Sequence, residues 1–304
     1  MANYLITGGT GLIGRALISQ LLVSSHQVTV LTRDINKARR VLPVEVNAIA
    51  HLGEFDPHQA LDYVVNLAGE PIADKRWSRA QKLKLWQSRV VLTEQLVVWL
   101  KSLSTPPKAL ISGSAVGWYG DCGKQILTEQ SPASAEYTHS LCRAWEAAAN
   151  QLAETGVRVC TVRTGLVISP QGGFLAKMKR PFQLGLGARL GSGEQYMSWI
   201  HIEDMVRALL FLIDEKGALE TPPMGTFNLT SPNPVTNRAF TRALAAQLKR
   251  PSCLVIPQFC LTTALGEMAR LLITGQRVVP QRLLKQGFCF HYPTLDLALT
   301  AAMP

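Results

Sequence analysis

Hydrophobic residues recur with two different spacings along the first half of the chain. Short runs of β-branched and other apolar residues predict strands at 4–7, 28–31, 44–49, 63–67, 108–112 and 158–163. Apolar residues at the spacing of a helix predict helices at 12–24, 78–102 and 135–155. Strands that alternate with helices form βαβ units with right-handed crossovers, so we expect an α/β fold built on a doubly wound parallel sheet.

The alternation is interrupted after Arg163, and this interruption divides the chain into two expected lobes. A glycine-rich stretch follows at 165–197, and the pattern then resumes with a strand at 198–202, a helix at 203–214 and a strand at 226–229. A proline-rich turn at 231–234 opens a more helical C-terminal part. We therefore expect a sheet lobe of residues 1–164 and 198–229, and a smaller, substrate-binding C-terminal lobe of residues 165–197 and 230–304.

A glycine motif follows the first predicted strand and opens the first predicted helix. It reads Thr7-Gly8-Gly9-Thr10-Gly11-Leu12-Ile13-Gly14. In a Rossmann fold that binds a dinucleotide, Gly8 would permit the tight turn, Gly11 would let the backbone approach the pyrophosphate, and Gly14 would let helix and strand pack closely. The phosphates would lie at the helix N-terminus, where N–H groups attract anions. The alternative is a glycine-rich turn that holds no ligand.

The end of the second predicted strand distinguishes between the two nicotinamide cofactors. An acidic residue there usually binds the ribose 2′-hydroxyl of NAD. Here the strand ends in Thr32 and Arg33, and a guanidinium can clamp a 2′-phosphate and stack on the adenine, which favours NADP(H). The alternative is that Arg33 only caps the strand and Asp34 binds the hydroxyl. After the fourth strand, the small residues in Leu67-Ala68-Gly69 leave room for the cofactor riboses.

Net charge and cysteine content narrow the expected partners. The chain of 304 residues carries a formal charge of +10, but the basic residues between 75 and 89 share a helical pattern with apolar ones. A solvated helix face explains such a pattern, and no nucleic-acid-binding motif accompanies it, so we expect no nucleic acid as a partner. The six cysteines are scattered without metal or redox spacing, and the N-terminus enters a strand directly. We expect a cytoplasmic protein without a metal site or a membrane span.

Five further segments, taken with the glycine motif, resemble the extended short-chain dehydrogenases, the class of sugar-nucleotide epimerases and dehydratases. Within that class the chain is most similar to the YfcH-like epimerase-family branch. This resemblance implies an NADP(H) site that includes Leu12, Ile13 and Arg89. The segments are Asn66-Leu67-Ala68-Gly69-Glu70-Pro71-Ile72, Leu110-Ile111-Ser112-Gly113-Ser114-Ala115, Arg143-Ala144-Trp145-Glu146, Ser198-Trp199-Ile200-His201-Ile202-Glu203-Asp204 and Phe227-Asn228-Leu229-Thr230-Ser231-Pro232.

The resemblance also implies two catalytic residues and exposes a departure from the superfamily pattern. Ser114 matches the serine that polarises the substrate oxygen, and Tyr137 matches the proton-transferring tyrosine of a Tyr-x-x-x-Lys pair. The lysine position holds Leu141. A phenol has a pKa of about 10 and needs a shift of about three units to act near neutral pH, which leucine does not supply. Packing in the first helical turn is the alternative role of Tyr137.

Two functions remain open on the sequence. The first is an NADP(H)-dependent oxidoreductase or epimerase that acts on a hydroxyl- or carbonyl-bearing small molecule, with a nucleotide sugar as one substrate class. The second is a catalytically impaired NADP(H)-binding sensor or scaffold, which Leu141 favours. Glu70, Arg76 and Trp77 in the loop after the fourth strand are expected to face the nicotinamide or the substrate. His201 with Glu203 and Asp204 fits no metal motif, and we expect Asp204 to cap a helix. A homodimer is compatible with the sequence.

Overall fold

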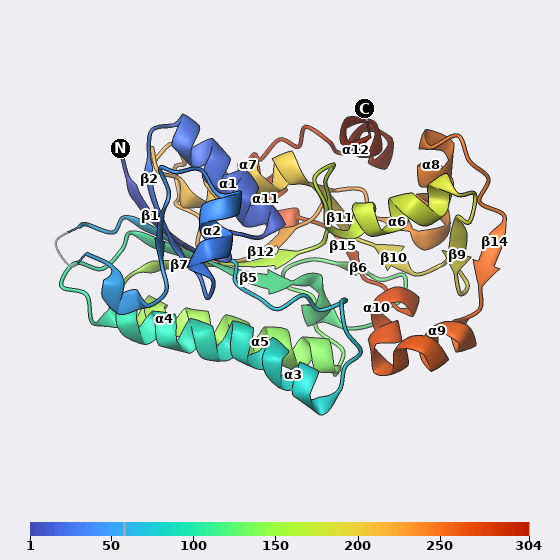
Figure 1. Ribbon diagram of the computed structural model, residues 1–304, viewed down its shortest axis with the longest axis horizontal. Coiled ribbons are helices and arrows are strands. Elements are labelled where there is room, and N and C mark those ends of the chain that lie inside the picture. The colour runs from blue at the N-terminus through green and yellow to red at the C-terminus, as the bar shows by residue number, and fades with distance from the viewer. Residues whose placement is uncertain (57–58, 304) are drawn as a thin grey trace.

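A computed structural model of the protein describes residues 1–56 and 59–303. Its centre is a sheet of seven strands in the order β12-β7-β5-β4-β1-β2-β3, and every neighbouring pair is parallel (Figure 1). This arrangement confirms the predicted doubly wound Rossmann fold. The strands are β1 (Asn3–Thr7), β2 (Gln27–Leu31), β3 (Asn47–Ile49), β4 (Tyr63–Asn66), β5 (Ala109–Ala115), β7 (Arg158–Thr164) and β12 (Gly225–Leu229).

One predicted strand is shorter than its sequence pattern indicates. The run at 44–49 pairs with β2 only from Asn47 onward. Its first residues form a turn in which the Val46 N–H donates to the carbonyl of Pro43 at 3.1 Å. Val44 is 94% exposed there. The apolar run therefore begins in solvent because the preceding proline directs the chain into a turn.

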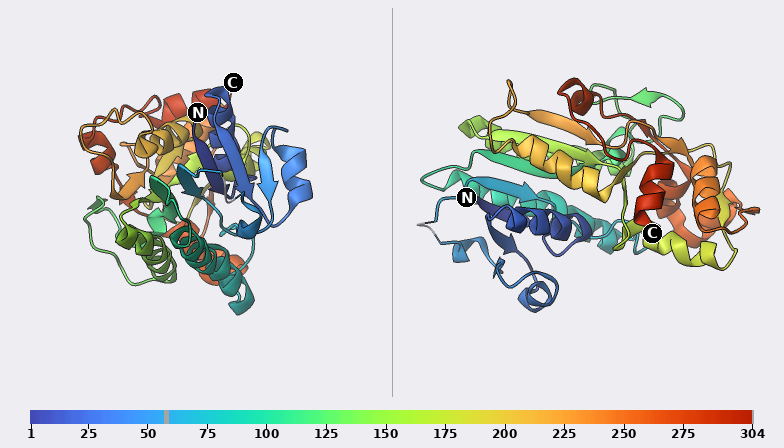
Figure 2. Two further views of the ribbon diagram at one scale, coloured as in Figure 1. Left: turned by 90° about the vertical axis from the view of Figure 1, so that its left-hand side faces the viewer. Right: turned by 90° about the horizontal axis from the view of Figure 1, so that it is seen from above.

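Helices cover both faces of the sheet because successive strand residues point to opposite sides. Tyr4 and Ile6 of β1 share a core with α1 and α7, whereas Leu5 belongs to the core on the side of α4. Figure 1 shows α3, α4 and α5 together below the sheet, and Figure 2 shows the same layers from two other directions. The covering helices are α1 (Leu12–Val23), α2 (Ile35–Val41), α3 (Arg79–Trp86), α4 (Leu92–Lys101), α5 (Tyr137–Asn150), α7 (Ile202–Ile213) and α11 (Gln281–Lys285).

Beyond the central sheet, the C-terminal part of the chain has a core of its own, which includes Phe182, Trp199 and Phe240. The strand predicted at 198–202 forms as β11 (Trp199–His201), but it pairs with β8 (Leu166–Ile168) rather than with the seven-stranded sheet. The two-lobe division stays a prediction, and its last residue, Pro304, lies outside the described residues. The remaining elements are β6 (Ile126–Leu127), α6 (Gly173–Gln183), β9 (Ala188–Leu190), β10 (Tyr196–Met197), β13 (Val235–Thr236), α8 (Asn237–Gln247), β14 (Leu254–Ile256), α9 (Gln258–Leu265), α10 (Arg270–Ile273), β15 (Arg277–Val278) and α12 (Leu295–Ala302).

Asp204 fastens the C-terminal segment to the first turn of α7. It is fully buried, and its carboxylate accepts hydrogen bonds from the N–H groups of His291 at 2.9 Å and Tyr292 at 2.8 Å. Arg207 donates to the same carboxylate at 2.9 Å. The expectation that Asp204 caps α7 is wrong, because the cap is the His201 side chain, whose Nδ1 accepts from the Glu203 N–H. Within the described residues, none of the helices is long and apolar enough to cross a membrane.

Replacing Asp204 should therefore loosen the C-terminal segment. We expect Asp204→Ala to lower the free energy of unfolding by about 3 kcal/mol, because it removes a fully buried carboxylate that binds two N–H groups and a cation. Urea denaturation would measure the loss. The control is Glu203→Ala on the same helical turn, whose exposed carboxylate accepts only from the Tyr292 hydroxyl and should cost less than about 1 kcal/mol. Equal costs would show that Asp204 is not an anchor.

Candidate active site

A cleft of about 1040 Å³ lies at the carboxyl ends of the central strands. The strand order reverses between β1 and β4, and this is the place where open α/β sheets bind their ligands. The cleft brings together the two ends of the site expected from the sequence. Of the expected site residues, those that line it are Gly8, Gly11, Leu12, Ile13, Gly14, Leu67, Arg89, Ser114 and Tyr137.

The glycine loop is packed so tightly that two of its glycines admit no side chain. Gly8 has a φ of +71°, and a Cβ placed on it would lie 2.6 Å from the carbonyl carbon of Leu67. A Cβ on Gly14 would lie 2.5 Å from the carbonyl oxygen of Gly8. The loop is therefore pressed between β4 and α1, which brings its backbone to the floor of the cleft.

The N-terminus of α1 has the properties of an anion site. Its N-cap is Gly11, which offers no side-chain acceptor, and its first turn contains no acidic residue. The first N–H groups of a helix have no partner within the helix, so those at Leu12 and Ile13 are left for a ligand. Both residues line the cleft, and Thr10 precedes them in the loop.

The end of β2 presents an exposed cation. The Arg33 side chain is 83% exposed, and its guanidinium lies 3.8 Å from the Glu70 carboxylate. Asp34 caps α2 by accepting from the Lys37 N–H at 2.8 Å, and its own N–H donates to the Thr32 hydroxyl at 3.2 Å. Asp34 is thus engaged in its own helix, while Arg33 is available to a phosphate.

The loop after β4 differs from its expected placement. Glu70 lies beside Arg33, at the end of β2, and not toward the nicotinamide end. Arg76 donates to the carbonyl of Thr263 at 3.0 Å, so it contacts the C-terminal part of the chain. Trp77 alone of the three lines the cleft, where its ring packs 5.1 Å from that of Tyr137.

Arg89 reaches the cleft from an irregular turn between α3 and α4. Residues Gln87–Val91 form a π-helical turn, a distortion found frequently at functional sites. The guanidinium donates to the main-chain carbonyl of Glu70 at 2.9 Å and would lie 3.0 Å from any Cβ on Gly69. Burial lowers the pKa of this guanidinium below its usual value. Because its hydrogen-bond partners are neutral, its charge is available to an anionic ligand.

A buried polar network beneath the glycine loop was not expected from the sequence. The Asn66 amide accepts from the Thr7 hydroxyl at 2.7 Å and donates to the hydroxyls of Thr93 at 2.8 Å and Ser112 at 3.1 Å. The Thr7 hydroxyl in turn accepts from the Ala68 N–H at 3.1 Å. This network joins β1, β4, β5 and α4 at the reversal point and fixes Ala68 at the edge of the site.

Ser114 lies at the end of β5, as predicted, but its hydroxyl is bonded to Glu146, a residue to which the sequence pattern assigned no role. It donates to the Glu146 carboxylate of α5 at 2.6 Å. Glu146 is buried and forms two hydrogen bonds with Arg163 of β7, at 2.8 and 2.9 Å. A hydroxyl has one proton to donate, so Ser114 keeps only acceptor capacity for a ligand. Burial raises the pKa of the neighbouring Cys142 thiol to about 11, so this thiol is protonated at neutral pH.

Arg163 is itself held from several directions. Its guanidinium donates to the Tyr119 hydroxyl at 3.1 Å and lies 3.5 Å from the centre of the Trp118 ring. The Tyr119 hydroxyl donates to the Asn228 side chain at 2.7 Å. Burial acts to lower the pKa of Arg163, but the hydrogen bonds and charge of Glu146 raise it above its usual value. Arg163 is therefore a cation at neutral pH and meets the Glu146 carboxylate as its counter-charge.

Tyr137 lines the cleft without the activation that a general base needs. Burial raises the pKa of its phenol, and the positive charge of Arg89 offsets only part of this effect. Its hydroxyl donates to the carbonyl of Lys82 at 3.4 Å, and the Lys82 ammonium lies over the ring, 4.5 Å from its centre. Leu141 is buried in an apolar cluster with Leu85 and Trp145. The lysine position is thus filled by core packing.

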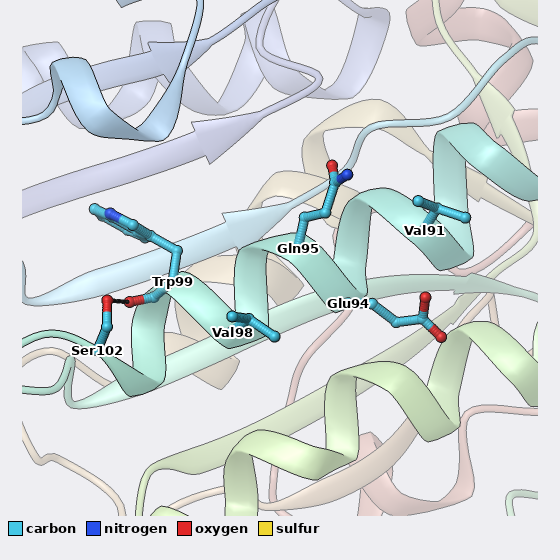
Figure 3. A pocket seen from close by; sticks show the side chains of 6 residues that line it. All are labelled: Val91, Glu94, Gln95, Val98, Trp99 and Ser102. Carbon is cyan, nitrogen blue, oxygen red and sulfur yellow. Dashed lines mark hydrogen bonds between the residues drawn. The ribbon is translucent and has the colours of Figure 1, made fainter.

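A second hollow lies on the outer face of α4 and is separate from this cleft. Figure 3 shows the side chains that line it, all from one side of the helix. They are Val91, Glu94, Gln95, Val98, Trp99 and Ser102. Its only titratable side chain is Glu94, so the hollow offers no chemistry comparable with that of the cleft.

The glycine loop, the parallel sheet and the cleft at its reversal point have a counterpart among known families. The sequence model of the NAD dependent epimerase/dehydratase family matches residues 4–229. The chain belongs to this family. A second model, a domain of unknown function named DUF1731, matches residues 256–302, so the family assignment and the C-terminal match together span most of the chain.

Relatives of the whole chain are found in bacteria, plants and humans. An epimerase family protein of Mycobacterium tuberculosis is 41% identical over an alignment of 304 positions, which covers 98% of this chain and 97% of the relative. The chloroplastic SDR39U1 homolog of Arabidopsis thaliana is 39% identical, with coverages of 98% and 86%. The crystal structure of human SDR39U1 with NADPH matches 99% of both chains with a TM-score of 0.89 and 30% identity. These findings confirm the resemblance to the epimerase/dehydratase superfamily.

The buried pair at the centre of this site makes a testable contribution to stability. We expect Arg163→Met to lower the free energy of unfolding by about 3–5 kcal/mol, because Glu146 is left buried without its counter-charge. Adding Glu146→Leu should recover part of that loss, since two apolar groups need no pairing. A double-mutant cycle in urea denaturation would measure the coupling. If the double variant lost the sum of the two single losses, the residues would act independently.

Proposed function

We propose that this protein binds NADP(H) in the cleft and transfers hydride to or from a hydroxyl- or carbonyl-bearing small molecule. The observation that carries the proposal is the combination of a bare helix N-terminus at Gly11 with the exposed cation Arg33 at the end of β2. The first suits a pyrophosphate and the second a 2′-phosphate. The NADPH complex of human SDR39U1 supports the same assignment.

The residues present fit this cofactor along its whole length. Gly8, Leu12 and Ile13 would hold the pyrophosphate, and Thr32 and Arg33 the adenosine phosphate. Ala68 and Gly69 leave space at the sheet edge, where Arg89 brings a positive charge against the backbone. When bound, the nicotinamide ring supplies the hydride chemistry. The protein supplies binding, orientation and a closed environment.

Ser114 would accept a hydrogen bond from the substrate and would not donate one. Because Ser114 donates its proton to Glu146, its oxygen can accept a hydrogen bond from a substrate hydroxyl. Glu146 is a positioning residue in this arrangement, since it fixes the rotamer of Ser114 and Arg163 fixes Glu146. Tyr137 would contribute contact area and would not act as a base, because burial raises its pKa. The proton that an alcohol loses on oxidation would leave by way of the Ser114 oxygen to water in the cleft, and it would return by the same route in the reverse reaction.

A second function is a cofactor-binding sensor or scaffold without turnover, and it is favoured by the hydrogen bonding of Ser114 and the raised pKa of Tyr137. A committed Ser114 proton and a phenol without a lysine partner make a weak acid–base pair. The two functions differ in a simple measurement. An enzyme oxidises NADPH in the presence of a suitable carbonyl compound, whereas a sensor binds NADPH and leaves it unchanged across a broad panel of carbonyls.

The cofactor assignment predicts a specific effect at Arg33. We expect Arg33→Ala to weaken NADPH binding by about 1.5–3 kcal/mol and to leave NADH binding almost unchanged, since only NADPH carries the 2′-phosphate. Fluorescence titration of both cofactors would measure this. Arg39→Ala, which removes an exposed cation from α2, is the matched control and should change neither affinity. Equal wild-type affinities for NADPH and NADH would contradict the assignment.

The catalytic part of the proposal predicts unequal roles for the two residues expected from the sequence. With any substrate that is turned over, Ser114→Ala should lower kcat/KM by about 100-fold, because the oriented acceptor is lost. Tyr137→Phe should lower it less than about threefold, since a phenol whose pKa lies above 10 stays protonated at pH 6–9. Steady-state kinetics across that pH range would test both. Complete loss of turnover in a folded, NADPH-binding Tyr137→Phe variant would refute this division.

A further inference from the structure

The part of the cleft beyond Ser114 and Tyr137 has a wall that is mainly apolar. This wall comes from the C-terminal part of the chain, from α6, β9, β10 and α10. Its apolar members are Phe174, Met178, Leu190, Met197, Leu271 and Leu272. Pockets that bind small molecules are lined mostly by such side chains, with few polar groups to orient the ligand.

Most polar side chains in this wall are bonded to the protein itself. The Gln195 amide donates to the carbonyls of Leu190 at 3.0 Å and Leu272 at 2.7 Å, so it ties the wall together. The Ser198 hydroxyl donates to the carbonyl of Gln276 at 2.6 Å. Asn237 accepts from the Leu190 N–H at 2.9 Å. These groups hold the wall in shape. The apolar side chains are left to meet the ligand, together with the buried Gln195 Oε1, which has no hydrogen-bond partner among the described residues.

The charges at this end are acidic on balance. The carboxylates of Asp121, Glu136 and Glu267 line the cleft here. Arg270 is bound by Glu136, and Lys82 is bound by Glu267 at 2.6 Å. Among the described residues, the cation that lines this end is Arg270, and its charge is already balanced by Glu136. The formal charge of +10 on the whole chain therefore does not make this end of the cleft basic.

The helix N-termini nearby do not reverse this balance. The N-cap of α5 is Glu136, whose carboxylate already places a negative charge there. α6 begins beside the cofactor half of the cleft, since a Cβ on Gly173 would lie 2.9 Å from the Leu12 side chain. Proteins bind phosphates with free cations and free helix N-termini, and here both are engaged or directed to the cofactor.

We propose that the substrate is an uncharged, mainly apolar hydroxyl compound and not a nucleotide sugar. An anionic diphosphate would have to displace a carboxylate from Arg270 or Lys82 and would face the remaining acids. An uncharged compound meets the apolar wall and offers its hydroxyl to the Ser114 oxygen. This inference rests on the proposed function, because it assigns the nucleotide-binding half of the cleft to the cofactor.

Binding of charged and uncharged probes to the NADPH-loaded protein tests this inference. Cinnamyl alcohol and cinnamate share a skeleton and differ in charge, and UDP-glucose is the nucleotide-sugar probe. An alcohol cannot be reduced by NADPH, so calorimetry would measure binding without turnover. We expect cinnamyl alcohol to bind at least about tenfold more tightly than cinnamate or UDP-glucose. Equal or undetectable binding of the two cinnamyl compounds, or tighter binding of UDP-glucose, overturns the inference.

Two variants make the test specific to the wall and its charges. Glu136→Gln frees Arg270 and should raise the affinity for cinnamate about tenfold without changing that for cinnamyl alcohol. Glu154→Gln, which breaks the exposed pair with Lys101 outside the cleft, is the matched control and should change neither affinity. Leu271→Asn should weaken cinnamyl alcohol binding several-fold. An unchanged cinnamyl alcohol affinity in that variant also overturns the inference.

The outcome can be separated from a failure of the proposed function. NADPH binding is titrated first, and its absence would refute the proposed cofactor. The cinnamyl comparison is then made on the protein without NADPH, with Glu136→Gln beside the wild type, because binding of cinnamate at the wall responds to that substitution and binding at the empty anion site of α1 does not. A preference for the anionic probes in both states overturns the uncharged substrate, whatever the cofactor result.

Discussion

A buried carboxylate is the constraint around which the half of the cleft that holds Ser114 and Tyr137 is organised. Glu146 lies between α5 and the sheet, where it is 7% exposed, and an unpaired charge there would cost several kcal/mol. Arg163 supplies the counter-charge from β7, and Trp118, Tyr119 and Asn228 hold Arg163 in turn. The pair thereby fixes α5 against β5, β7 and β12. The same carboxylate accepts the Ser114 proton, so the requirement for pairing also determines what Ser114 offers to a ligand.

This constraint separates the cleft into two halves that follow different rules. The cofactor half depends on backbone geometry, because tight packing at Gly8 and Gly14 and a bare helix N-terminus suffice to receive phosphates. The catalytic half depends on side chains, and there a leucine stands in the core where the superfamily pattern has a lysine. The backbone geometry that suits a cofactor does not depend on the side chains near Tyr137. One chain can therefore combine a complete glycine loop with a leucine at the lysine position.

The sequence predicts the framework of the cofactor half of the cleft well and the side-chain contacts around Ser114 poorly, for a physical reason. Hydrophobic periodicity and the glycine motif are local patterns, and they sufficed for the parallel sheet, the position of the glycine loop and the position of Arg33 after β2. Glu146 and Arg163 stand 17 positions apart on different elements, and no local spacing pairs a helical glutamate with a strand arginine. The position of Glu70 beside Arg33 was not predicted for a related reason. The direction of its loop depends on long-range contacts such as the hydrogen bond from the Glu70 N–H to the Ser88 hydroxyl. The Asn66 network likewise needs four elements to meet.

Charge at the rim of the cleft connects substrate choice with the closure of the fold. Lys82 binds Glu267, Arg270 binds Glu136, Lys177 binds Asp74, and Arg76 donates to the Thr263 carbonyl. Each contact joins the sheet-bearing part of the chain to the C-terminal part across the cleft. Exposed pairs of this kind are individually weak, so several are needed to keep the two parts together. Under the substrate proposal made above, these pairs have a second consequence, because a cation that binds a carboxylate must exchange that partner before it can bind a phosphate.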